Sequence, residues 1–476
     1  MSADVAAAIQ AVLDERLTLP PAVDEIAERF QEAGHQLFLV GGAIRDALLG
    51  RLHENELPDL DFATDATPDV TRGLLEGLHE VLWTQGEAFG SIGFMREGLR
   101  YEITTFRADA YAPASRKPAV SEVADIETDL SRRDFTVNAM ALSLPDRRFL
   151  DPLGGIGDLH QKLLRTPGSA QDSFTDDPLR MVRAARFVSQ LGLAPAPEVI
   201  AAMKQLAERL DIVAHERIRE EFSKLMTGTY PSIGLELLTE AGLSDRFLPE
   251  LAALKLEQDP IHRHKDVYRH SLAVLDKICA YDSEHPDLVL RLAGLLHDIG
   301  KPSTRKIDSD GVSFHHHDVV GARMATERLQ TMAFSGQIIQ PVAKLIELHL
   351  RFHTFKMGWS DSAVRRYARD AGDLLDRLNI LVRCDCTTRN KRRARELEAA
   401  MDEFEARLAE LREKEDLAAI RPPIDGNEIM EHLGIKPGPL VGKALAHLLE
   451  IRLEEGEYSR ERAFEELDAW AKAQDI

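Results

Sequence analysis

The pattern of apolar residues changes once along this chain, near Asp176. Before that point, short apolar and β-branched runs alternate with helix-like segments, which is typical of a sheet packed on helices. After it, helical periodicity continues almost to the end, interrupted by prolines at intervals. The sequence therefore predicts an α+β fold, with a mixed sheet-plus-helix head followed by all-α segments.

The chain has 476 residues, which is enough for about three or four domains. A basic stretch at 387–395 opens a long charged helix, and it suits either contact with a phosphate backbone or a solvated surface. We expect five segments: an N-terminal helical segment at 1–36, the mixed head at 37–165, a helical neck at 166–255, a metal-binding helical domain at 256–390, and a helical tail at 391–476.

Charge and cysteine content limit the partners and the compartment. The net charge of −21 argues against a protein that coats itself in nucleic acid non-specifically, although it leaves room for a local basic groove. No apolar run approaches the ~18 residues of a membrane span, and the N-terminus lacks a secretory pattern. The three cysteines match no disulfide framework or zinc pattern. We therefore expect a cytoplasmic protein with no membrane partner.

In the head, a glycine pair follows the first expected strand. We expect strands at 35–40, 57–63 and 100–107, and a loop at 108–120. Gly41 and Gly42 lie between the first strand and a helix, where bare backbone N–H groups form an anion cradle. Arg45, in the first helical turn, is well placed to meet phosphate oxygens. The alternative is a tight turn without a ligand.

Carboxylates on the next two expected strands point to metal chemistry. Asp59 and Asp61 are two residues apart, so a strand directs both side chains to one face. Adjacent carboxylates are costly unless a divalent cation neutralises them, and such a pair can hold one or two magnesium ions against a triphosphate. Glu102, on the third strand, is a candidate third carboxylate. The alternative is an exposed Asp-x-Asp turn.

A second pair of charges suits the recognition of a base. Asp177 and Arg180 are three residues apart on an expected helix and therefore share a face. A carboxylate beside a guanidinium complements the Watson–Crick edges of cytosine and adenine, whereas uracil and guanine present the opposite order of donors and acceptors. This arrangement predicts selection of CTP and ATP. The alternative is a helix start, with Asp177 as the cap before Pro178.

Four motifs in the first 190 residues together resemble one known family. They are 39–64 (LVGGAIRDALLGRLHENELPDLDFAT), 131–142 (SRRDFTVNAMAL), 151–165 (DPLGGIGDLHQKLLR) and 176–187 (DDPLRMVRAARF). In this order they resemble the signatures of class II tRNA nucleotidyltransferases and bacterial poly(A) polymerases. The family's last motif begins with Glu-Asp, whereas this chain has Asp176-Asp177.

The resemblance implies a template-independent polymerase that adds nucleotides to an RNA 3′ end. It implies two metals on Asp59 and Asp61, and it gives Asp177 and Arg180 the same base-selecting role. The residues that we expect to bind the nucleotide are Gly41, Gly42, Arg45, Arg133, Asp134, Asn138, Asp177, Arg180, Arg183 and Arg186.

The middle of the chain holds a second set of candidate metal ligands. Adjacent His297 and Asp298 end an apolar helix, and further histidines and an aspartate lie at a distance along the sequence. Imidazole nitrogens with carboxylate oxygens suit divalent metals. The set resembles that of an HD phosphohydrolase domain, which implies metal-activated attack of water on a phosphoester. The full set of expected ligands is His270, His297, Asp298 and Asp385, with His317 and His349 for a second metal.

We therefore predict a CCA-adding tRNA nucleotidyltransferase that uses CTP, ATP and Mg²⁺, with tRNA as its partner and an unidentified divalent metal in the HD domain. No DNA partner is expected. Three alternatives stay open: poly(A) addition or partial CC- or A-addition, an enzyme whose main activity is the HD phosphohydrolase, and a pure RNA-binding module.

Overall fold

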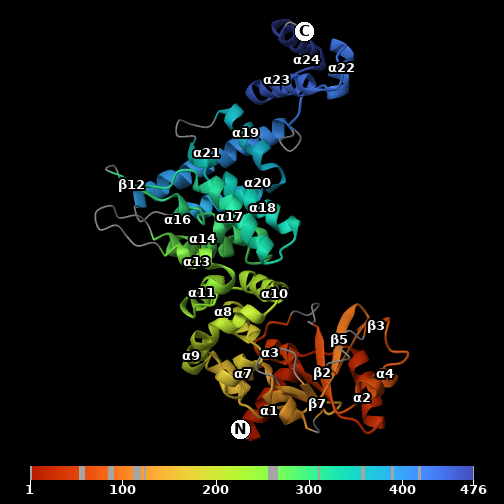
Figure 1. The fold of residues 1–476 in the computed structure, drawn as a ribbon. Coiled ribbons are helices and arrows are strands. Elements are labelled where there is room, and N and C mark those ends of the chain that lie inside the picture. Colours follow the sequence, from red (N-terminus) through yellow and green to blue (C-terminus); the bar gives the residue numbers. More distant parts are fainter. Residues whose placement is uncertain are drawn as a thin grey trace. The chain divides into compact units, whose positions relative to one another are not determined.

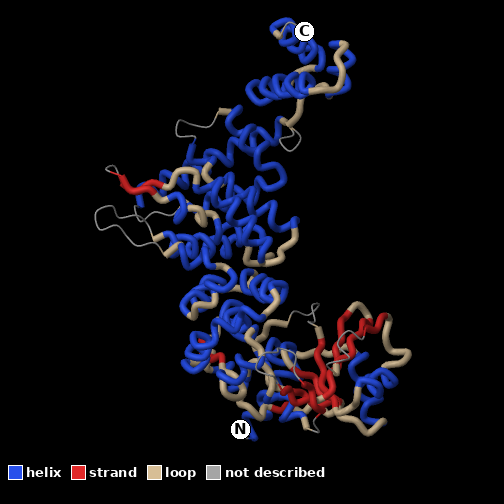
Figure 2. Tube along the Cα trace, in the orientation of Figure 1, coloured by secondary structure: helices blue, strands red, loops and turns tan. Residues whose placement is uncertain are grey.

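The computed structural model describes residues 3–52, 59–83, 90–110, 119–122, 125–255, 266–308, 311–354, 360–386, 391–415 and 420–474. The chain divides into two compact units, Met1–Phe247 and Leu248–Ile476. Figure 1 follows the chain from the strand-containing head to the helical C-terminal part, and Figure 2 shows most strands gathered in the head. This is the predicted α+β fold, whereas the five-segment division stays a prediction.

The first unit is built on one seven-stranded sheet, with the order β3-β4-β5-β2-β1-β8-β9. Strands β2 and β5 pair in parallel, and the other neighbours pair antiparallel. The strands are β1 Leu37–Val40, β2 Leu60–Thr64, β3 Val81–Trp83, β4 Ser91–Arg96, β5 Leu99–Thr105, β8 Ala141–Leu144 and β9 Phe149–Leu150. Five of them, β1, β2, β4, β5 and β8, bring buried apolar side chains to the core of the head.

Helices pack against this sheet. The N-terminal helical segment is divided before Pro20-Pro21, because α1 ends at Arg16 and α2 begins at Pro21, a favoured first helical residue. Helix α2 buries Val23, Ile26 and Phe30 along one stripe. The helices of the head are α1 Ala3–Arg16, α2 Pro21–Glu32, α3 Gly42–Leu48, α4 Pro68–Leu74, α5 Ile126–Ser131 and α6 Gly155–His160.

Two local predictions in the head need correction. The expected strand at 57–63 is β2 Leu60–Thr64, so Asp59 precedes it, while 57 and 58 lie outside the described residues. Both ends of the expected loop at 108–120 lie in paired strands, β6 Arg107–Ala110 and β7 Ala119–Glu122, while 111–118 lie outside the described residues. Proline and alanine composition did not signal this backbone pairing.

The rest of the first unit is helical apart from one short parallel pair, β10 Leu163–Leu164 with β11 Ala194–Pro195. Helix α8 begins just after Pro178 and ends at Gly192, whose φ of 66° is readily adopted by glycine. The ring of Phe187, on this helix, packs edge-on against the ring of Phe135, with the ring centroids 5.6 Å apart. The helices here are α7 Ala170–Asp176, α8 Leu179–Leu191, α9 Pro197–Leu206, α10 His215–Met226, α11 Pro231–Glu240 and α12 Ser244–Phe247.

The described residues of the second unit are helical except for a short hairpin, β12 Lys306–Asp308 with β13 Gly311–Ser313. The described residues include no helix long and apolar enough to span a bilayer. The helices are α13 Pro249–Ala253, α14 Val267–Tyr281, α15 Leu288–Leu296, α16 Lys301–Thr304, α17 His317–Thr331, α18 Gly336–Leu348, α19 Asp361–Ala371, α20 Leu375–Asp385, α21 Lys391–Lys414, α22 Gly426–Leu433, α23 Pro439–Glu455 and α24 Arg460–Ala473.

Candidate active site

Two of the predicted carboxylates lie side by side on the sheet. Asp61 of β2 is the register partner of Glu102 on the parallel strand β5. Directly paired residues direct their side chains to the same face, so these carboxylates are neighbours although they lie 41 positions apart in sequence. Asp59 is exposed just before the strand, and it is close enough to act electrostatically on Asp61.

The environment of Asp61 disfavours its charge. The carboxyl group keeps access to solvent, but the protein packed around it removes part of its hydration. This desolvation, with repulsion from Glu102 and Asp59, raises the pKa of Asp61 to about 6, although Arg133 opposes the shift. Crowded carboxylates of this kind are suited to a divalent cation, which would relieve the repulsion.

The glycine pair adjoins the carboxylates. Gly41 has a φ of 80°, a conformation that other residues rarely adopt. A Cβ built on it would lie 3.7 Å from both Asp61 Oδ2 and Arg133 Nη1, so the bare backbone faces these groups. Arg45 bonds to its neighbour Asp46 at 2.8 and 2.9 Å and donates to Asn138 Oδ1 at 2.6 Å.

A cleft of about 580 Å³ opens beside these groups. All ten residues predicted to bind the nucleotide line it, together with Asp61, whereas Asp59 and Glu102 are outside its lining. Eight of its lining residues are basic and three are acidic, so a strongly acidic protein presents a positive cleft. The lining consists of Gly41, Gly42, Arg45, Asp61, Arg132, Arg133, Asp134, Asn138, Asp177, Arg180, Arg183, Arg186, Phe187, Gln190, Arg217 and Lys224.

Arg183 connects three segments at the base of the cleft. Its guanidinium donates to Asp134 Oδ2 at 2.9 and 2.5 Å and to Glu221 Oε1 at 3.1 Å. Arg186 pairs with the other oxygen of Glu221 at 2.9 Å. Although burial opposes it, Arg183 lowers the pKa of Asp134 well below its usual range. Burial and the neighbouring Arg183 lower the pKa of Arg186 to about 10, which leaves it protonated at neutral pH.

The predicted base-reading pair is held from several directions. Asp177 Oδ1 accepts the Leu179 N–H at 3.2 Å, while Oδ2 accepts from Arg217 at 3.3 Å. Asp177 thus makes the helix-start contact of the alternative interpretation and still lines the cleft. Arg180 donates to Ser173 Oγ at 2.8 Å and to the Arg132 carbonyl at 2.6 Å.

Sequence reasoning missed five cleft residues. The Phe187 ring is the most central of them, because the guanidiniums of Arg45, Arg183 and Arg186 lie 5.3, 5.8 and 4.3 Å from its centroid. Its place at the end of the fourth motif was a usable signal. Arg217 lies on α10, 40 positions beyond Asp177, and no local pattern links the two. The five are Arg132, Phe187, Gln190, Arg217 and Lys224.

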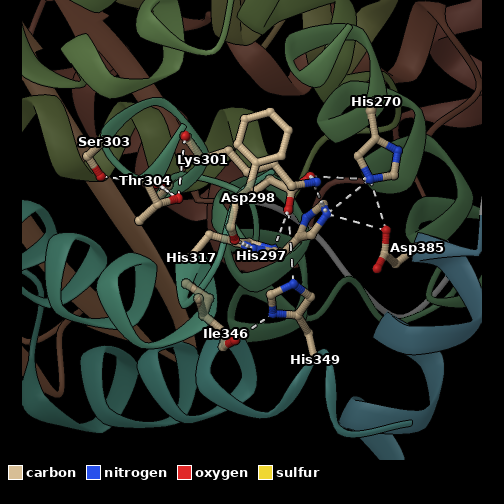
Figure 3. Close-up of polar contacts among 12 residues, drawn as sticks. His270, His297, Asp298, Lys301, Ser303, Thr304, His317, Ile346, His349 and Asp385 are labelled. Carbon is tan, nitrogen blue, oxygen red and sulfur yellow. Dashed lines mark hydrogen bonds and ion pairs between the residues drawn. The ribbon is translucent and has the colours of Figure 1, made fainter. Parts of the chain in front are cut away.

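In the second unit, the six predicted metal ligands form one buried centre (Figure 3). They fall into two groups, His270 with His297 and Asp385, and Asp298 with His317 and His349. The two oxygens of Asp298 face different histidines. Oδ2 lies 3.5 Å from His270 Nε2 and 3.3 Å from His297 Nε2, and Oδ1 lies 3.3 Å from His317 Nε2 and 4.0 Å from His349 Nε2.

The protonation of this centre fits a metal. Burial and the nearby His297 lower the pKa of His349 to about 4, so its ring is neutral at pH 7 and can act as a ligand. Burial would lower the pKa of His297 as well, but Asp298 and Asp385 outweigh it and raise that pKa to about 10. The Nε2 atoms of His317 and His349 are buried and make no hydrogen bond. A divalent ion would satisfy these nitrogens and replace the charge that His297 carries.

Comparison with known proteins places these features in a family. The family described as Poly A polymerase head domain matches residues 37–165, Probable RNA and SrmB- binding site of polymerase A matches 192–255, and HD domain matches 267–390. The A-adding tRNA nucleotidyltransferase of Deinococcus radiodurans is 38% identical over 360 residues, which are 73% of this chain and 80% of that protein. The chain belongs to the tRNA nucleotidyltransferase family.

Other family members match over shorter segments or by fold. A CCA-adding enzyme of Geobacillus stearothermophilus is 38% identical over 228 residues, 48% of this chain. The chain spans about half the length of that relative, 54%. A solved Bacillus stearothermophilus CCA-adding enzyme in complex with CTP has a TM-score of 0.70 at 23% identity and covers 96% of this chain and 99% of its own. This nucleotidyltransferase therefore shares the fold of CCA-adding enzymes, and its nucleotidyltransferase and HD domains both imply the use of divalent metals.

The raised pKa of Asp61 predicts metal binding that depends on pH. A cation binds the ionised carboxylate, so protons compete with it below about pH 6. We expect the apparent Mg²⁺ affinity of the head to fall by about tenfold between pH 7 and pH 5, whereas a carboxyl group of ordinary pKa would change little. Calorimetric titration of the wild type and of Asp61→Asn, measured as a difference, isolates this site from the HD centre. Equal affinities at the two pH values would contradict the prediction.

Proposed function

We propose that this enzyme adds C, C and A in turn to the 3′ end of tRNA, using CTP, ATP and Mg²⁺ without a template. The observation that supports it most strongly is the single cleft in which Asp61, the glycine pair and the Asp177–Arg180 pair meet. Phosphate-binding groups and base-reading groups therefore face one space large enough for a nucleotide. Family membership supplies the reaction class.

Asp59 and Asp61 would hold Mg²⁺, with Glu102 beside them. The ion would neutralise the charge that develops on the attacking and leaving oxygens. Arg133, next to Asp61, and Arg186, deeper in the cleft, would meet the triphosphate through charge-assisted hydrogen bonds. Arg183 would act by positioning, because Asp134 and Glu221 already engage its guanidinium.

Base choice rests on Asp177 and Arg180. For Arg180 to read a base, the nucleotide must compete with Ser173 and the Arg132 carbonyl for its guanidinium. Arg217 would keep Asp177 oriented. CTP and ATP then gain paired donors and acceptors, whereas UTP and GTP leave a buried charge unmatched.

The acceptor and the compartment belong to the same proposal. A solved Thermotoga maritima CCA-adding enzyme complexed with tRNA shares the fold of this chain, with a TM-score of 0.61. The local positive cleft gives an acidic chain a means to engage RNA phosphates. Cys279, Cys384 and Cys386 are all free thiols, as is usual in the cytoplasm.

Addition of only the terminal A is the second candidate. It is favoured because the A-adding relative matches 73% of this chain, whereas the CCA-adding relatives in the comparison match about half. Both activities use the same cleft and differ in whether CTP is a substrate. They are therefore separated by supplying the nucleotides one at a time.

We expect purified enzyme with Mg²⁺ to extend tRNA lacking its terminal trinucleotide by three residues when CTP and ATP are both present, and by two with CTP alone. Sequencing of the product ends measures this. Asp61→Asn should abolish extension, because the metal-binding charge is lost, while the exposed Asp69→Asn on α4 serves as a control with full activity. Extension only of tRNA that already ends in CC would favour A-addition, and a long A tract would favour poly(A) synthesis.

We expect Asp177→Ala to raise the kcat/KM for UTP, relative to that for CTP, by about tenfold or more. The variant loses the carboxylate that rejects the Watson–Crick edge of uracil. Turnover with CTP should fall less than in Asp61→Asn. The matched control is Asp172→Ala on the exposed face of α7. An unchanged ratio of UTP to CTP incorporation would assign Asp177 to helix capping alone.

The buried HD centre supports a second activity, metal-dependent hydrolysis of a phosphoester. Its six ligands are complete, and Asp298 offers one oxygen to each group of histidines. A pair of ions held in this way would supply an activated water. Imidazole and carboxylate ligands suit several divalent ions, so the experiment compares several metals.

We expect the Asp61→Asn enzyme, inactive in its head, to release phosphate from nucleotides or open cyclic phosphates when Mn²⁺, Co²⁺, Ni²⁺ or Mg²⁺ is supplied. His297→Ala should lower this rate at least a hundredfold and reduce the bound metal measured by mass spectrometry. His315→Ala, which changes an exposed histidine near the centre, is the control. Metal binding without hydrolysis would leave the domain a structural role.

A further inference from the structure

The carboxylate-bearing face of the sheet continues beyond Glu102 to an aromatic residue. Glu102 on β5 pairs with Gly93 on β4, and Gly93 pairs with Trp83 on β3. Since register partners share a face, Asp61, Glu102, the bare Gly93 position and Trp83 form one row across four strands. Trp83 is half-buried, so part of its ring remains open to solvent.

Contacts place the indole flat on this face. A Cβ on Gly93 would collide with the Trp83 ring nitrogen, so the indole covers the space that a side chain at Gly93 would take. The Arg100 guanidinium lies over the Trp83 ring, 5.3 Å from its centroid, so a base that stacks on the indole must displace it. Arg100 also pairs with Glu102 at 3.6 Å while its side chain stays 49% exposed. An aromatic surface and a solvent-accessible cation therefore stand next to the carboxylates.

The geometry of phosphoryl transfer indicates which substrate would contact this surface. The cleft adjoins Asp61 on the side of Gly41 and Arg133, where the triphosphate would lie. In phosphoryl transfer the attacking oxygen enters roughly opposite the leaving group. The RNA 3′ hydroxyl then approaches from the other side of Asp61, toward β5 and β4, where Glu102 and Trp83 lie.

We propose that Trp83 and Arg100 bind the terminal nucleotide of the RNA acceptor, with the base stacked on the indole and the guanidinium beside its phosphate. This inference rests on the proposed nucleotidyl transfer and names a binding site for its acceptor. Stacking tolerates any base, because every base has a π-face. Such a platform suits an enzyme whose acceptor ends in more than one kind of base over the three additions.

Acceptor affinity and nucleotide affinity separate this role from a structural one. We expect Trp83→Ala to raise the KM for a tRNA acceptor about tenfold and to leave the KM for CTP within about twofold, while Trp83→Phe restores most of the loss. Val81→Ala, an exposed apolar residue on the same strand, is the matched control. Gly93→Ala should reproduce the effect of Trp83→Ala, because the added methyl group displaces the indole.

A double comparison tests stacking itself. The acceptor is prepared with a final residue that keeps its ribose but lacks its base. Wild-type enzyme should bind it about tenfold more weakly than the normal acceptor, whereas Trp83→Ala should bind the two equally. If the wild type extends tRNA but both comparisons show no difference, this inference is overturned and the proposed function stands. If the wild type extends no RNA at all, both are overturned.

Discussion

Arg183 holds together the segments from which the cleft is made. Its guanidinium lies between Asp134, which follows α5, and Glu221 of α10, while its own helix α8 carries Arg180 and Phe187. Asp134 and Glu221 are buried, and buried charges are tolerated only when they are paired, so removal of one partner leaves the others uncompensated. The positions of the proposed base-reading pair and of the arginines proposed to bind phosphate therefore depend on this ion-pair chain. Asn138 extends it to Arg45 beside the glycine turn.

The same arrangement explains how an acidic protein handles polyanions. A net charge of −21 keeps the surface as a whole repulsive to nucleic acid. Within the cleft, eight basic residues outnumber three carboxylates. Ion pairs with buried acidic side chains fix the positions of several of these arginines. Attraction is thereby confined to the cleft where we propose that the triphosphate binds. On the sheet, Asp61 and Glu102 form the opposite kind of site, a cluster of acidic groups that suits cations.

Sequence reasoning found the parts of the site that local pattern encodes. All ten nucleotide-binding candidates line one cleft, and the six predicted HD ligands form one centre. Each of them lies in a motif whose residue types and spacing indicate its chemistry. Asp59 was placed inside a strand that begins one residue later, since alternation alone does not fix where backbone pairing starts. Arg217 and Trp83 were missed for a different reason. Their places beside the candidate site come from pairings between distant segments, which a single sequence does not display.

The pairing of Asp61 with Glu102 has a consequence for how preparations of this enzyme should be judged. The two carboxylates face each other only because β2 and β5 are joined in one particular alignment. Sliding β5 by a single position would turn Glu102 to the opposite surface and carry the buried Tyr101 and Ile103 out of the core. The apolar packing of the head therefore holds the two carboxylates in alignment, and a molecule that lost this alignment would lose that packing as well. Tertiary packing of the head, rather than helix content, is the measure of whether the carboxylates are aligned.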